Sequence, residues 1–209
     1  MAVYYRYKDW TVEDVRPIDC AVVSLELREA DRREIFASTA DASACCAPCS
    51  NFNGADARGA CDSCGSVGRA ADASAGLPPE EICNVRQGEQ GAARAVVESV
   101  RGSRVCFCVK RNGAAVMLFG VARRALLGDA HVVWALASSE IERAPFAFLR
   151  HCRRAVAGLN EVFPVMVNFV GVWNDQSLRW LRWCGFRVLE ARRIGIHGEW
   201  FYPVIKRRV

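Results

Sequence analysis

The pattern of apolar and polar positions is clearest near the end of the chain. From Val165 to Val172, apolar residues dominate both alternating sets of positions. A strand that is apolar on both faces is typical of the middle of a sheet that is covered on both sides. Asn174 can cap a following helix by accepting a hydrogen bond from a free backbone N–H. Leu178 and Leu181 recur at helical spacing, and Gly185 is a typical residue just beyond a helix end.

The same patterns predict the elements on the N-terminal side. They are an opening strand and a short helix in residues 1–20, with a capping-box pattern at 11–14; a helix at 89–100; strands at 105–109 and 115–121, joined by an Asn112–Gly113 turn; a strand at 131–136; a helix at 146–160; and a closing hairpin at 186–205. This order predicts an α/β protein. Its sheet is mixed, mostly antiparallel and made of six or seven strands flanked by helices, in a single domain over residues 1–209.

Residues 41–84 differ in composition and are predicted to be a cysteine-rich insertion. Ala, Ser, Gly and Asp dominate the segment, which therefore lacks the large apolar groups needed for a core of its own. Two Cys-x-x-Cys pairs, at Cys46, Cys49, Cys61 and Cys64, can close a tetrahedron around zinc. Cys45 could replace Cys46. Two disulfides, an iron–sulfur cluster and a disordered thiol-bearing loop are the alternatives.

Charge and hydropathy indicate where the protein is located and what it contacts. No apolar run approaches the ~20 residues that a membrane span needs, and the N-terminus has no signal-peptide pattern. These features predict a soluble protein, inside a cell or packaged in a particle. The net charge is +5. The basic residues gather at Arg150, Arg153, Arg154, Arg179, Arg182, Arg187, Arg192, Arg193, Lys206, Arg207 and Arg208. They are interpreted either as solvated helix faces or as a contact with nucleic acid or an acidic protein.

Two sequence patterns resemble known families. Asn174, Ser177, Leu181 and the Gly185–Phe186 pair follow the pattern Asn-x-x-Ser-x-x-x-Leu-x-x-x-Gly-Phe. This pattern resembles the C-terminal half of the GNAT superfamily, the acyl-CoA-dependent N-acetyltransferase fold. A second pattern consists of Leu27, Arg28, Asp31, Glu34 and Ile35. This second pattern is similar to one in a GNAT-like internal virion protein family of short-tailed phages. We expect Asp31 and Glu34 to be solvated charges or members of ion pairs.

The GNAT resemblance implies a coenzyme A site, but the family's chemical residues are missing. The family binds pyrophosphate with Arg/Gln-x-x-Gly-x-Gly/Ala, whereas no glycine lies between Leu136 and Phe148. Glu140 and Glu142 would place negative charge where phosphates must bind. The family's tyrosine acid would stand at the position of Leu181. The sequence therefore disfavours acetyl-CoA and predicts no catalytic residue. If coenzyme A does bind, the expected contacts are Ser138, Ser139 and Asn174.

These observations lead to one main functional hypothesis and two alternatives. The main hypothesis is a catalytically silent GNAT-like structural or assembly protein of a tailed phage, located in the virion or the host cytoplasm. Its expected partners are other virion proteins, further copies of itself, and packaged DNA held by the basic residues. The first alternative is an acyl-CoA-dependent N-acetyltransferase with a degenerate coenzyme A loop. The second is a zinc-stabilised binding module that uses residues 45–83 as its recognition surface.

Overall fold

The computed structural model describes residues 2–38, 79–127, 129–143, 145–195 and 197–208, with side chains placed for these except at 79–89, 123–127, 143 and 145–150. The elements, in chain order, are β1 (Val3–Tyr7), β2 (Trp10–Asp14), α1 (Pro17–Leu25), α2 (Glu29–Ser38), α3 (Pro79–Arg101), β3 (Ser103–Arg111), β4 (Ala114–Leu127), β5 (Ala130–Ala137), the 3₁₀ helix η2 (Ser139–Arg143), α4 (Pro145–Val162), β6 (Val165–Gly171), α5 (Asp175–Trp183), β7 (Arg187–Val188), β8 (Arg192–Ile194) and β9 (Glu199–Arg207). None of the helices in these ranges is long and apolar enough to cross a membrane.

The described strands form one mixed sheet, which confirms the predicted α/β class. The strand order is β1-β2-β3-β4-β5-β6-β9-β7, and β8 also pairs with β9. Every pair is antiparallel except β5 with β6. This sheet has nine strands, more than the six or seven predicted. The extra strands arise because the opening segment forms a hairpin and the closing segment is divided into two short strands.

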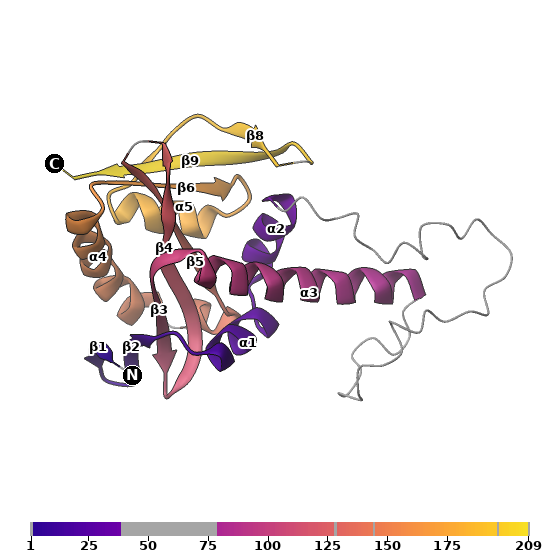
Figure 1. Cartoon of the computed structure of the whole chain (residues 1–209), viewed down its shortest axis with the longest axis horizontal. Helices are drawn as coiled ribbons and strands as arrows, with labels where there is room; N and C mark the ends of the chain where they lie inside the picture. The colour runs from indigo at the N-terminus through magenta and orange to yellow at the C-terminus, as the bar shows by residue number, and fades with distance from the viewer. Residues whose placement is uncertain (1, 39–78, 128, 144, 196, 209) are drawn as a thin grey trace, which may run out of the picture.

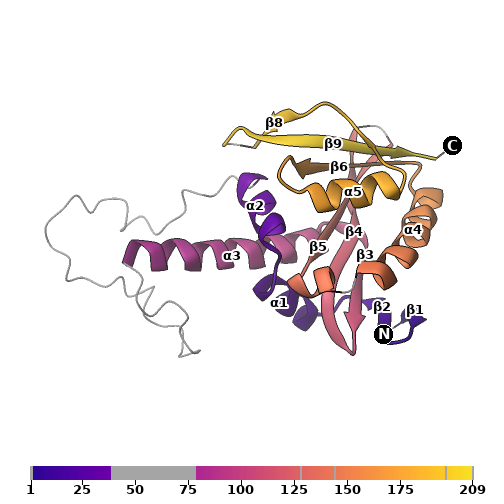
Figure 2. The same cartoon turned by 180° about the vertical axis from the view of Figure 1, so that it is seen from behind.

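Helices cover both faces of the sheet (Figures 1 and 2). On one face, Val23 of α1 and Val96 of α3 pack with Leu118 of β4. On the other face, Leu178 of α5 joins Met166 of β6 in a second core cluster. The long helix α3 extends beyond the sheet (Figure 1). The sheet is therefore buried on both faces, as its apolar strands predict.

The predicted helix start at residues 11–14 is wrong. These residues belong to β2, in which Val12 pairs with Val109 of β3. Lys8, with a φ of 52°, turns the chain between β1 and β2. Pro17 occupies the first turn of α1, where its missing N–H costs no hydrogen bond. Pairing with a distant strand thus overrides the local capping pattern.

The predicted insertion falls largely outside the described residues. Cys46, Cys49, Cys61 and Cys64 all lie there, so the zinc site stays a prediction. The last part of the proposed segment, 79–84, belongs to α3, which begins well before the predicted residue 89. Within the described ranges, no group of three or more His, Cys, Asp or Glu side chains could hold a metal ion.

A buried ionic cluster joins β2, β3 and the start of α1. Lys110 is only 2% exposed, and its Nζ lies 2.9 Å from Glu13 and 3.4 Å from Asp19. Arg16 binds Asp19 through its side chain and its backbone N–H. Burial works to raise the pKa of Asp19, but Arg16 and Lys110 hold it below its ordinary value. Hydrogen bonds from Lys110 and Thr11 likewise lower the pKa of Glu13.

This cluster predicts a loss of stability in acid. Because the folded-state pKa values of Glu13 and Asp19 lie below their unfolded values, their contribution is present above the unfolded values, near pH 4, and is lost as the pH falls through the folded values. We expect the urea concentration at the unfolding midpoint to decrease when the pH is lowered below about 4. The fall should be smaller in the Asp19→Asn variant, measured against its own midpoint at pH 5. An equal fall in both proteins would contradict the assignment to this cluster.

Candidate active site at the β5–β6 splay

The parallel strands β5 and β6 separate after a short paired stretch. They pair at Ala130–Val165, His131–Met166 and Val132–Val167. Beyond these positions, residues 133–137 of β5 continue to pair with β4, and residues 168–171 of β6 continue to pair with β9. The two strands therefore open into a V between their C-terminal halves. In open sheets, such a divergence at the carboxyl ends of parallel strands is a typical ligand site.

Helix α2 places one carboxylate on each arm of the V. The backbone N–H of Ala137, at the end of β5, donates to Asp31 Oδ2 at 2.9 Å. The backbone N–H of Gly171, at the end of β6, donates to Glu34 Oε1 at 3.0 Å. Asp31 and Glu34 are three residues apart and thus lie on the same side of the helix. The sequence pattern that joins these acids therefore corresponds to a clamp across the opening.

The two carboxylates have different partners. Asp31 is 2% exposed, and its Oδ1 accepts a hydrogen bond from Arg28 Nη2 at 2.6 Å. It therefore forms an ion pair, which is one of the two alternatives expected from the sequence, the other being a solvated charge. Glu34 receives the Asn174 side-chain amide at 2.8 Å and has no cationic side chain within ion-pair distance among the described residues. Neither acid is a solvated surface charge. This burial was missed because both backbone contacts are more than 100 residues away in the sequence.

Burial brings the pKa of Glu34 into the range that proton transfer near neutral pH requires. Burial raises its pKa to about 7, and the nearby charge of Asp31 acts in the same direction, whereas the hydrogen bond from Asn174 opposes the shift. Burial also raises the pKa of Asp31, against the effect of Arg28. A carboxylate with a pKa near neutrality matches the requirement for a general base at physiological pH.

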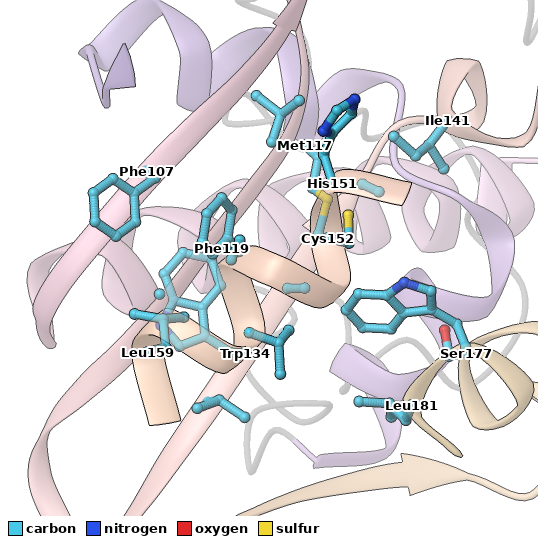
Figure 3. Close-up of a pocket in the computed structure, with 18 of the residues that line it drawn as sticks. Phe107, Met117, Phe119, Trp134, Ile141, His151, Cys152, Leu159, Ser177 and Leu181 are labelled. Carbon is cyan, nitrogen blue, oxygen red and sulfur yellow. The ribbon is translucent and has the colours of Figure 1, made fainter. Parts of the chain in front are cut away.

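A cavity of about 880 Å³ adjoins the opening and is lined by Asp31 and Glu34. Figure 3 shows side chains from three directions around it: Phe107 and Phe119 from the sheet, Cys152 and Leu159 from α4, and Leu181 from α5. Most of the lining is apolar, and its carboxylates come from α2. Such a mainly apolar pocket with a few convergent polar groups is typical of a binding site for a small molecule.

The structure separates the three predicted coenzyme A contacts. Ser138 is fully buried just after β5, and its Oγ has no hydrogen-bond partner in the described part of the chain. Ser139 is exposed and begins η2. Asn174 caps α5 by accepting from the Ser177 N–H, while its amide group donates to Glu34. Asn174 thus orients the candidate base, and Ser138 retains an unused hydroxyl.

Comparison with solved structures identifies the fold. A Vibrio fischeri ribosomal-protein-S5-alanine acetyltransferase aligns with a TM-score of 0.53 and 10% identity, over 99% of this chain and 97% of that one. A ribosomal L7/L12 α-N-protein acetyltransferase in complex with coenzyme A has a TM-score of 0.55 and 6% identity, over 99% and 98%. The yncA protein of Salmonella typhimurium, with its cofactor acetyl-CoA, has a TM-score of 0.52 and 13% identity, over 96% and 94%. The chain therefore has the GNAT fold.

Comparisons of the amino-acid sequence do not assign the chain to a family. No protein-family model matches the chain, and no curated protein matches it. Nothing in the comparisons supports the resemblance to an internal virion protein of phages.

The structural relatives correct two predictions. The hypothesis of a catalytically silent structural protein is contradicted, because the relatives that share the fold over nearly the whole chain are acetyltransferases and favour the acyl-CoA alternative. The expectation that acetyl-CoA is disfavoured conflicts with the coenzyme A and acetyl-CoA bound in two of them. The sequence argument rested on the missing glycine loop, which concerns the phosphates of the cofactor and not the splay or the carboxylates beside it.

Proposed function

We propose that this protein is an acyl-CoA-dependent N-acyltransferase. The observation that carries the proposal is Glu34, a partly buried carboxylate whose pKa is raised to about 7 and which is held at the mouth of the β5–β6 splay beside a cavity. An enzyme that transfers an acyl group to an amine needs a base at the point where the amine meets the thioester. The GNAT fold of the chain agrees with this assignment.

The residues of the splay suit the acyl end of a coenzyme A thioester. The thioester, when bound, supplies an activated acyl group. Ser138 follows the cavity-lining Ala137 and has a buried hydroxyl that lacks a partner among the described residues, and Arg28 and Arg179 line the cavity. The glycines of the family's phosphate loop are absent between Leu136 and Phe148, and η2 lies in this part of the chain. We infer that binding relies more on the splay and the cavity than on that loop.

In the proposed reaction, Glu34 accepts a proton from the amine. The lone pair of the amine forms the new C–N bond at the thioester carbonyl carbon, and the C–S bond breaks. The departing thiolate takes its proton from water, because Leu181 stands where the family has a tyrosine acid, and the hydroxide so formed takes the proton from Glu34 and restores the base. Asn174 and the Gly171 N–H hold the Glu34 carboxylate in place during the transfer.

A panel of amine acceptors tests the proposal. Two of the structural relatives are named as a protein α-N-acetyltransferase and a spermidine N-acetyltransferase, so the panel combines peptides with free N-termini, a lysine peptide and polyamines. With acetyl-CoA as donor, mass spectrometry should detect one added acetyl group on at least one acceptor, together with released coenzyme A. If acetyl-CoA is not consumed with any acceptor, and the protein does not bind it, the proposed function is wrong.

A further inference from the structure

The cavity is far larger than an acetyl group requires. Its volume of about 880 Å³ lies near the upper end of the range for pockets that enclose whole drug-sized ligands. It extends from the splay across β5, β4 and β3 to β2, whose Val12 also lines it. At the usual spacing of about 4.8 Å between strands, three strand intervals correspond to about 14 Å.

The floor of the cavity is one face of the sheet. Two rows of paired residues cross it: Phe107–Phe119–Ala135, and Val109–Met117–Ala137. In both rows the residue on β5, next to the splay, is an alanine. The residues on β4 and β3, further from the splay, have larger side chains. The Phe107 and Phe119 rings lie 5.2 Å apart, and Tyr4 packs edge-on to Phe107 at 5.1 Å. The floor is thus apolar throughout and becomes aromatic away from the splay.

Helix α4 forms the roof, and small residues on its lining face leave volume free for the cavity. Cys152, Ala155 and Gly158 line the cavity at helical spacing. A Cβ built on Gly158 would meet nothing within 4 Å. By contrast, Val156 and Leu159 pack against the core cluster of β6 and α5, which fixes the C-terminal part of the helix. The space under α4 therefore follows from the sequence of its lining face.

Polar groups stand at both ends of the cavity. Asp31 and Glu34 stand at the splay, with Arg28 beside them. At the far end, the Tyr5 hydroxyl lies 2.5 Å from Nδ1 of His151 and joins β1 to α4. The Tyr5 and Tyr7 rings also lie 4.9 and 4.5 Å from the imidazole. Between these two ends lies the apolar sheet face formed by the rows of β3, β4 and β5.

We propose that the cavity under α4 binds the acyl chain of the donor, and that the preferred donor carries a linear chain of about twelve carbons rather than an acetyl group. An extended chain advances about 1.2 Å per bond, so about twelve bonds span the distance from β5 to β2. The inference rests on the proposed function, because it places the thioester carbon at the splay beside Glu34. The apolar lining suits methylene groups, which have no hydrogen bonds to lose on entry.

Binding of a series of thioesters tests this inference. Coenzyme A, acetyl-CoA, octanoyl-CoA and lauroyl-CoA are titrated into the full chain by calorimetry, below the concentration at which the longer thioesters form micelles. Burial of each methylene should tighten binding by about fourfold. Allowing for incomplete burial and chain ordering, we expect lauroyl-CoA to bind at least about 100-fold more tightly than acetyl-CoA.

Three glycine and alanine variants locate the effect. Gly158→Phe and Ala155→Phe each place a ring in the proposed chain path, and both should reduce the lauroyl-to-acetyl ratio of affinities by at least about tenfold. Gly91→Phe is the matched control: Gly91 lies in the exposed part of α3, and a Cβ there would also meet nothing within 4 Å. This control should keep the wild-type ratio.

The outcomes separate the two proposals. If coenzyme A and acetyl-CoA bind but lauroyl-CoA binds no more tightly, the acyl-chain site is wrong while the proposed function stands. If lauroyl-CoA binds tightly and equally well to the wild type and to both cavity variants, its chain lies elsewhere and the inference also fails. If none of the four ligands binds, the proposed function itself is overturned.

Discussion

Replacing Glu34 with Gln should reduce kcat/KM for acyl transfer by about 10²–10⁴-fold, the usual contribution of a positioned general base. Glutamine has the same shape, and its carbonyl oxygen can still accept the hydrogen bonds of the Gly171 N–H and the Asn174 amide. The loss should therefore come from chemistry rather than from unfolding. The affinity for acetyl-CoA should change by less than the rate does.

The dependence of kcat/KM on pH tests the role of Glu34 as the base in a second way. Because burial raises the pKa of Glu34 to about 7, its basic form appears only as the pH rises through this value. Wild-type kcat/KM should thus increase up to about pH 7 and then level off, and the Glu34→Gln variant should lack this limb. Glu161→Gln, an exposed change on α4, should keep the wild-type profile. An unchanged limb in Glu34→Gln would exclude Glu34 as the base.

The same substitution should make the protein more stable above pH 7. Since the folded pKa of Glu34 lies above its unfolded value, ionisation costs the folded state stability as the pH rises from about 4.5 to 7. At pH 8, Glu34→Gln should increase the free energy of unfolding by about 2–3 kcal/mol, and at pH 4.5 the two proteins should be similar. A gain in stability coupled to a loss of activity is expected for a strained catalytic group.

Replacing Lys110 with Met should cost about 3–5 kcal/mol of stability. Lys110 is 2% exposed and is the charge partner of Glu13 at 2.9 Å and Asp19 at 3.4 Å. Without it, two carboxylates near the start of α1 would lose the ammonium group that compensates their burial. Urea denaturation should show a lower midpoint with an unchanged m-value.

A surface ion pair provides the comparison. The Arg94–Glu98 pair on α3 has side chains that are 68% and 60% exposed, so Arg94→Met should change the free energy of unfolding by less than about 1 kcal/mol. The two substitutions remove the same kind of charge from different environments. A loss below about 1 kcal/mol for Lys110→Met would show that burial of the cluster contributes little.

Local chemistry made several elements predictable from the sequence. Asn112 and Gly113 both have positive φ angles, 50° and 81°, as an Asn-Gly hairpin turn requires. Asn174 caps α5, and Gly185, with a φ of 89°, follows its end. The segment at 11–14 was mispredicted because pairing of Val12 with Val109 cannot be seen from nearby residues. Elements fixed by their own turns and caps were thus accessible, and those fixed by distant partners were less so.

The candidate site was harder to predict because it depends on burial. Glu34 acquires its properties from Gly171 and Asn174, which lie about 140 positions later in the chain. The spacing of Arg28, Asp31 and Glu34 was visible as a signal, but an exposed helix shows the same pattern. The cavity likewise depends on the small residues of α4 lying over the sheet face beside the splay. Only the fold brings these features together.

The central claim is that the β5–β6 splay binds a coenzyme A thioester, and calorimetric titration of the full chain with acetyl-CoA tests it most directly. The account predicts saturable binding with one site per chain, retained in Glu34→Gln and competed by free coenzyme A. Absence of any binding at millimolar acetyl-CoA, in a sample that shows cooperative unfolding, would contradict it.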